Sequence, residues 1–473
     1  MWKKLLITGC VTFSLLSGGT LSAQPSCEIK EEVTSEQLDR TQKELVAMMK
    51  ELKNDSYFQT ELDKAAVQSS LSKRMAAYKD LTVRLLSVLE IQAELEWMKP
   101  EAIQEALGIM KKSSGFDAVL ADKRFGELKS LLAGGFDGIY TGDAQAIDKA
   151  NKTLTLKRKL MLMSPDVNVD KMLTVKFDLG ERANFVGAGS LGIQPNNWSN
   201  LSSASRKNFK AQLVELSGLQ SGELSEKVLY KPAVDGSSVT DLVLNWDGKR
   251  LMFTALDTTR RWQVHELDIN NGEAKQVTNI PEPDLEFFDG TYLPDGRMLA
   301  ISNIGYQGVP CVNGSDAVGN MVLYDPSNGY LRRLTFDQDA NWHPVVMANG
   351  KVMYVRWEYT DLTHYFSRIV MHMNPDGTEQ KSLYGSGSMF PNSIFDVQPL
   401  PKHTNRFVGV ISGHHGVARS GRLMIFDPAK SRKEEKGMIQ ELPFRGRPII
   451  PEVKDELVNG VWPQFIKPYP LTD

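Results

Sequence analysis

The run Asp247-Gly248-Lys249-Arg250-Leu251-Met252-Phe253 is a polar turn that leads into an apolar, β-prone segment. Similar runs begin at Asp295, Asn349 and, more loosely, Asn405, at successive distances of 48, 54 and 56 residues. Asp-Gly and Asn-Gly turns before such a segment are typical of antiparallel hairpins. The repetition predicts a chain built from several similar strand-turn-strand units.

A second β-prone segment follows each turn, at 264–268, 322–325, 369–374 and 423–427, and each ends in a polar turn. Units of this length and pattern predict four-stranded blades, so we expect a mainly β protein with a β-propeller over 165–473. An earlier, degenerate unit is expected over 170–232.

The number of blades is predicted as about five to six, the last one incomplete. The run 461–468 resembles the first strand of a further blade, yet the sequence stops at Asp473, where the next turn is expected. An open propeller would expose an unpaired strand edge. An N-terminal strand could close it, a partner could, or the chain could be a shortened product of a longer ancestor.

The N-terminus reads as a secretory signal peptide over 1–23. Lys3 and Lys4 precede an uncharged stretch from Leu5 to Leu21, and Ala23 offers a small residue for cleavage. The pattern predicts export to the periplasm or outside the cell, not an integral membrane protein. Anchoring as a lipoprotein through Cys10 is the less favoured alternative, because few apolar residues precede that cysteine.

The region 24–160 has helical periodicity. Leu38, Leu45, Met48 and Leu52 recur at steps of three, four and seven residues and therefore share one helix face. Thr34 and Gln37 have the spacing of a capping box at the start of that helix. Such apolar stripes predict a helical bundle rather than a cofactor pocket.

Composition excludes several classes of protein. The net charge is −3 and no polybasic run tracks a nucleic-acid backbone, so nucleic acid is not an expected partner. Three cysteines are too few for a disulfide scaffold. The sequence contains no C-x-x-C-H motif, so covalent c-type haem is not expected.

Several further motifs, in order, carry a family resemblance: 305–311, 336–344, 356–361, 364–368, 412–416 and 467–471. Together they resemble bacterial proteins with a domain like the middle domain of the hydrazine synthase alpha subunit, a TolB/WD40-like propeller. The resemblance covers the chain from about Lys159 onward. It implies a propeller and export. The haem chemistry of hydrazine synthase is not carried over, because the haem-attachment motif is absent.

Candidate functional residues come from the topology of a four-stranded blade. The loops between second and third strands, at 256–262, 305–320, 358–367 and 413–421, are expected at one mouth of the propeller, joined by 336–344. Loops on a rigid scaffold commonly carry function. Three interpretations of this mouth stay open: a ligand site, a metal site, and side chains that only hold the blades together.

The favoured function is a binding or scaffold module for a protein partner or a small polar or glycan ligand. Its candidate ligand-binding residues are Arg261, Tyr359, Asp361, His364, Tyr365 and Arg419. The alternative is a metal-dependent, possibly redox, enzyme, since imidazole, thiolate and carboxylate groups suit transition metals. Its candidate metal ligands are Cys311, Asp337, Asp339, His343, His414 and His415. No catalytic residue is assigned.

Overall fold

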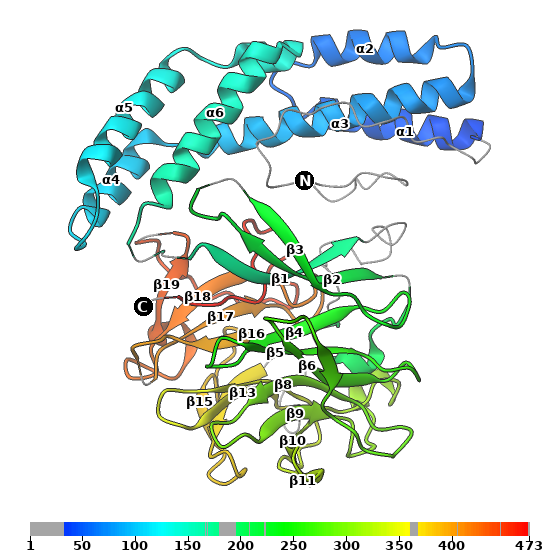
Figure 1. Ribbon diagram of the computed structural model, residues 1–473, viewed down its shortest axis with the longest axis vertical. Helices are drawn as coiled ribbons and strands as arrows, with labels where there is room; N and C mark the ends of the chain where they lie inside the picture. Colours follow the sequence, from blue (N-terminus) through cyan, green and yellow to red (C-terminus); the bar gives the residue numbers. More distant parts are fainter. Residues whose placement is uncertain are drawn as a thin grey trace. The chain divides into compact units, whose positions relative to one another are not determined.

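The computed structural model describes residues 33–471, apart from 166, 168, 179–194, 208, 222–223, 360–367, 404 and 445 (Figure 1). The predicted signal peptide lies outside the described residues, as do three candidate ligand-binding residues, Asp361, His364 and Tyr365. The chain divides into two compact units, a helical one up to Met172 that also includes 216–226, and a unit of β-sheets.

The helical unit contains α1 (Ser35–Met49), α2 (Ser56–Ala66), α3 (Leu71–Glu96), α4 (Pro100–Met110), α5 (Ala118–Ala133), the short 3₁₀ helix η1 (Asp137–Thr141) and α6 (Ala144–Met161). The predicted capping box is present, with reciprocal bonds between Thr34 and Gln37. The predicted stripe is buried, since Leu38, Leu45 and Met48 are almost inaccessible. Within the described residues, no helix combines the length and apolarity needed to cross a membrane.

The rest of the chain is mainly β, with several antiparallel sheets, as predicted. The first sheet has three strands, β1 (Lys171–Asp178), β2 (Lys210–Ser217) and β3 (Ser225–Tyr230). The second has β4 (Val239–Leu244), β5 (Arg250–Leu256), β6 (Trp262–Asp268) and β7 (Ala274–Gln276). The third has β8 (Phe287–Tyr292), β9 (Met298–Ser302), β10 (Asn320–Asp325) and β11 (Tyr330–Arg333).

Two further antiparallel groups of four strands follow. The fourth group has β12 (Asn341–Val346), β13 (Val352–Trp357), β14 (Arg368–Met373) and β15 (Lys381–Tyr384). The fifth has β16 (Ser393–Pro399), β17 (Phe407–Ser412), β18 (Arg422–Phe426) and β19 (Met438–Leu442). A single parallel pairing of Arg368 with Ser393 joins the two groups, and below they are called the fourth and fifth sheets.

The first strands of the four-stranded sheets are neighbours. Strand β8 contacts β4 and β12, and β12 contacts β16. Apolar side chains fill the space between adjacent sheets, and one buried cluster includes Trp262 of the second sheet, Phe288 of the third and Tyr354 of the fourth. The sheets are therefore held together face to face by a continuous core rather than by their edges.

Each of these four first strands carries a bulge at the same place. The register shifts after Thr240 in β4, Phe288 in β8, Trp342 in β12 and Phe395 in β16. The next residue has a positive φ in every case: Asp241 at 54°, Asp289 at 53°, His343 at 54° and Asp396 at 48°. Bulges re-aim side chains, so four sheets present one polar residue each in an equivalent way.

The C-terminal segment differs from the prediction. The run 461–468 forms no regular strand and pairs only through an isolated bridge between Phe465 and Gly421. Trp462 in this run is 71% exposed, whereas Trp342 and Trp357 are buried. The residue that matches the bulge position is Lys467, with φ 44°.

Candidate functional site

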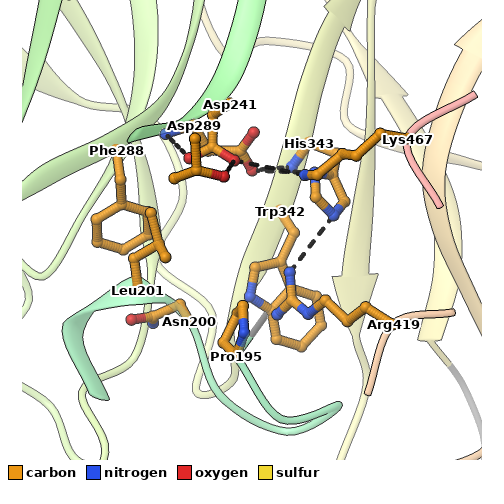
Figure 2. Close-up of a pocket in the computed structure, with 11 residues that line it drawn as sticks. Pro195, Asn200, Leu201, Asp241, Phe288, Asp289, Trp342, His343, Arg419 and Lys467 are labelled. Carbon is orange, nitrogen blue, oxygen red and sulfur yellow. Dashed lines mark hydrogen bonds and ion pairs between the residues drawn. The ribbon is translucent and has the colours of Figure 1, made fainter. Parts of the chain in front are cut away.

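Five polar residues, one from each bulge and one from the C-terminal segment, form what we call the charged ring: Asp241, Asp289, His343, Asp396 and Lys467. Figure 2 shows four of them, Asp241, Asp289, His343 and Lys467. The backbone N–H of Asp289 donates to Asp241 Oδ2 (3.2 Å), and that of His343 donates to Asp289 Oδ2 (2.5 Å). His343 Nε2 lies 3.1 Å from Asp396 Oδ1. Lys467 Nζ lies 3.1 Å from Asp396 Oδ1 and 3.4 Å from Asp241 Oδ1. The contacts thus return to the residue at which they began.

The charges of the ring compensate one another. Burial by itself raises the pKa of Asp289, but the neighbouring His343 and Lys467 outweigh it and hold that pKa below its usual range. The pKa of Asp396 is lowered in the same way. Burial raises it, but the charge of Lys467 outweighs burial. Burial opposes the charge of Lys467, yet the carboxylates of Asp396 and Asp241 raise its pKa. Lys467 is thus held in ion pairs with Asp396 and Asp241.

A cavity of about 10 Å³, room for roughly one water molecule, lies beside the ring. Apart from ring residues, its lining is formed by Pro195, Asn200, Leu201, Thr240, Phe288, Trp342 and Arg419. Burial lowers the pKa of Arg419 to about 10, so this guanidinium is still charged at neutral pH. Its Cζ lies 4.9 Å from the Trp342 ring centre and 5.0 Å from that of Phe395.

A segment at 195–201, here called the central segment, binds loops of the third and fifth sheets and the first residue of strand β14 in the fourth. The Asn197 side-chain amide donates to the carbonyls of Gly413 (2.7 Å) and Val417 (3.1 Å), and its Oδ1 accepts from the Arg419 N–H (2.7 Å). Asn200 donates to the Ala317 carbonyl (2.7 Å). The Arg419 guanidinium also donates to the Ser199 carbonyl.

His414 and Arg368 lie against this segment. The Arg368 Nε–H donates to the Asn197 carbonyl (2.7 Å), and its Nη2 lies 2.5 Å from His414 Nδ1. The Arg368 guanidinium also stacks over Trp357 at 4.2 Å. Both side chains are buried. At this point of the predicted mouth, the central segment therefore fills the space between the described loops.

His415 is placed differently from its neighbour. Its Nδ1 lies 2.7 Å from Asp455 Oδ2, and its N–H donates to Asp455 Oδ1 (3.1 Å). The imidazole packs edge-on against Trp198 at 5.3 Å and is about half exposed. Of the candidate histidines that the structure describes, His415 alone combines an orienting carboxylate with solvent access.

Asp337 and Asp339 bond Arg356 and Tyr359, respectively. Asp337 Oδ2 pairs with Arg356 Nη2 (3.1 Å), and Asp339 Oδ2 accepts from the Tyr359 N–H (3.0 Å). Burial raises the pKa of Asp339 to about 6, helped by the nearby charge of Glu358. Asp339 is thus a buried carboxyl group held mainly by one backbone donor.

The side chain of Arg261 is bonded to nearby parts of its own chain. Its Nη2 lies 2.8 Å from Asp257 Oδ2, and its Nη1 donates to the Glu282 carbonyl (2.6 Å). The candidate residues thus separate into several places, although His343 and Arg419 meet at 3.4 Å. Among the residues that the structure describes, no cluster of three or more His, Cys, Asp or Glu side chains could hold a metal ion. The side chain of Cys311 lies outside that description.

Sequence reasoning missed most of the charged ring. Asp241, Asp289, Asp396 and Lys467 were not candidates, nor was Arg368. A signal was present in the repeats. Four ring residues follow the residue at the start of a bulge, in Thr240-Asp241, Phe288-Asp289, Trp342-His343 and Phe395-Asp396, and the fifth follows Ile466 in the C-terminal segment. Aligning the units on the first strand, instead of on the Asp-Gly turn, would have brought these five positions into one column.

Comparison with known proteins gives structural neighbours alone. No family model and no curated protein sequence matches the chain. Among solved structures, hydrazine synthase from Kuenenia stuttgartiensis is similar at 14% identity and a TM-score of 0.43, over 64% of this chain and 41% of that one. TolB from Acinetobacter baumannii is similar at 14% identity and TM-score 0.32, over 59% and 67%.

A putative TolB from Agrobacterium tumefaciens is similar at 17% identity and TM-score 0.29, over 37% of this chain and 57% of that one. Hydrazine synthase and TolB proteins, the two named by the sequence resemblance, are thus among the structural neighbours. This chain spans less than half the length of the hydrazine synthase chain that it matches.

Proposed function

We propose that this chain is an exported binding or scaffold module without covalent c-type haem. The proposal rests on the polar contacts of those mouth residues that the structure describes. Arg261, Arg368, Arg419, His343 and His414 all use polar groups to bond loops, strands and the central segment of their own chain. Such residues stabilise a rigid surface, and rigid surfaces with loops at their rim are used for recognition.

The proposal includes a closed five-bladed propeller. Lys467 supports this, because it contacts Asp241 of the second sheet and Asp396 of the fifth. The first sheet has three strands where the others have four. We propose that the C-terminal segment takes the place of its missing inner strand, so that the chain closes on itself and leaves few unpaired edges.

The test is the metal and haem content of the purified protein over 24–473, by elemental analysis and absorption spectroscopy. A folded protein with neither metal nor haem is the expected result. Near-stoichiometric zinc, copper or iron would contradict it and favour an enzyme. Analysis of the N-terminus of protein recovered from the periplasm would test export, since cleavage after Ala23 is expected.

A second candidate function, a metal-dependent enzyme, is favoured by His415. A carboxylate that holds one imidazole nitrogen is the usual outer-sphere partner of a metal-bound histidine, and Asp455 has that position. If this function is correct, His415→Ala and Asp455→Asn both lose bound metal, while His403→Ala retains it. Metal-free wild-type protein would exclude this alternative.

A further inference from the structure

Two aromatic side chains of the third sheet are unusually exposed. Tyr306, in the loop after β9, is 62% exposed, and Phe336, in the loop after β11, is 72% exposed. The loop after β9 joins the second and third strands, and the loop after β11 leads to the next sheet. In an antiparallel sheet of four strands, both loops emerge at the same end. The two rings therefore belong to one rim.

Arg333 connects the Phe336 ring to Gln307, the residue that follows Tyr306. Its guanidinium lies 4.8 Å from the centre of the Phe336 ring, and its Nη2 donates to Gln307 Oε1 (3.2 Å). Its Nε donates to the Thr335 carbonyl (2.8 Å). The guanidinium is thus fixed by three contacts. We call Tyr306, Gln307, Arg333 and Phe336 the aromatic platform.

The backbone under Tyr306 is held in an uncommon conformation. Tyr306 has φ 48°, a left-handed value that costs about 1 kcal/mol or more for a residue with a side chain. Gly305 precedes it, and a Cβ there would overlap Asn320 Oδ1. The next carbonyl, of Gln307, accepts from the Val318 N–H (2.8 Å). A tightly bonded loop therefore displays an exposed tyrosine at a strained position.

We propose that the aromatic platform binds a carbohydrate. The apolar C–H face of a sugar ring stacks on an aromatic ring, while its hydroxyl groups need planar, preoriented hydrogen-bonding partners at the edge. The platform offers the exposed face of Phe336, the ring and hydroxyl of Tyr306, and the amide of Gln307 fixed against Arg333. The proposal rests on the proposed binding function and names its ligand class.

A carbohydrate fits this platform better than a protein surface does. Protein-binding surfaces centre on a contiguous apolar patch that is desolvated on binding. Here a polar pair, Gln307 with Arg333, lies between the two aromatic residues along the chain of contacts. Alternation of aromatic and polar groups matches the alternation of C–H faces and hydroxyl edges along an oligosaccharide.

The experiment is calorimetric titration of the protein over 24–473 with cellohexaose, chitohexaose and hexagalacturonate. Binding of at least one is expected. Phe336→Ala and Tyr306→Ala should each weaken it by roughly tenfold or more. Tyr330→Ala is the matched control, because Tyr330 is also exposed (53%) but begins β11 at its other end. Its affinity should equal that of the wild type.

Absence of binding to all three saccharides overturns the proposal, and so does binding that the Phe336 and Tyr306 variants retain. Capture of a protein through Phe336 without saccharide binding overturns it as well. Metal content measured on the same sample separates the two hypotheses. A metal-free protein that binds no saccharide refutes only the platform, whereas a metal-loaded protein refutes the proposed function whatever the titration shows.

Discussion

At the scale of single residues, the charged ring concentrates opposing charges where water has little access. Asp396 and Asp241 are buried, and each is compensated mainly through Lys467 or His343. Removing one partner of such a group leaves the other charged and without compensation, which is more damaging than removing both. The ring is therefore a set of mutually dependent residues.

Lys467→Met is expected to lower the free energy of unfolding by about 1–3 kcal/mol, less than for a fully buried pair because Lys467 is partly exposed. Urea denaturation at neutral pH measures the effect. Lys467→Arg keeps the charge and should recover most of the loss. Equal stability of Lys467→Met and the wild type would show that the ring contacts contribute little.

Asp339 predicts that stability depends on pH in the direction opposite to that expected for a salt-bridged aspartate. Because its folded-state pKa is raised to about 6, the native state favours the protonated form, and stability falls as pH rises from about 4 through 6. Asp339→Asn should therefore stabilise the protein by about 2 kcal/mol at pH 7 and have little effect at pH 4. An identical effect at both pH values would contradict this assignment.

At the scale of elements, the central segment contributes more than its length suggests. Within its seven residues, Asn197, Ser199 and Asn200 bond loops of the third and fifth sheets and Arg368 of the fourth, and the Asn197 side chain alone makes three bonds to buried backbone groups. A segment with this many buried polar contacts specifies one arrangement of the loops around it, since each unmade bond would leave a buried polar group without compensation.

Asn197→Ala should destabilise the protein by about 2–4 kcal/mol, because the Gly413 carbonyl and the Arg419 N–H lose this partner together and the Val417 carbonyl keeps only the Ser412 hydroxyl. Asn196→Ala is the matched control, since the adjacent Asn196 side chain is exposed. Thermal unfolding of both variants measures the difference. If the two variants unfold at the same temperature, the central segment does not organise the loops.

At the scale of the whole molecule, the C-terminal segment connects parts of the chain that are far apart in sequence. Lys467 contacts Asp241, 226 residues away, and Asp396, 71 residues away. Contacts of this range are formed late and are lost early when a β protein opens.

A variant that ends after Gly460 tests the proposed closure. Amide exchange should become faster in β4 and β16, which carry Asp241 and Asp396, while β9 in the third sheet stays protected. Exchange followed by mass spectrometry measures this. Unchanged protection of β4 and β16 would mean that the segment does not close the molecule.

The helices and most strands could be predicted because their signals are local. The turn at Asp247-Gly248 and the stripe around Leu45 each depend on residues a few positions apart. The charged ring could not be predicted in the same way, because its successive members lie 48 to 71 residues apart and meet only once the strands bulge and the C-terminal segment folds back. The C-terminal segment was harder still, because the equivalence of His343 and Lys467 emerges only from the structure.

The repeated bulge makes the charged ring interchangeable unit by unit. Each of the four bulged strands and the C-terminal segment supplies one side chain at a fixed place, so a substitution that tolerates a positive φ alters the chemistry of the ring without rebuilding the backbone. The balance of charges couples the five positions. In a lineage of such chains, a change from acid to base in one unit would persist together with the reverse change in an adjacent unit, and these positions should vary as neighbouring pairs rather than singly.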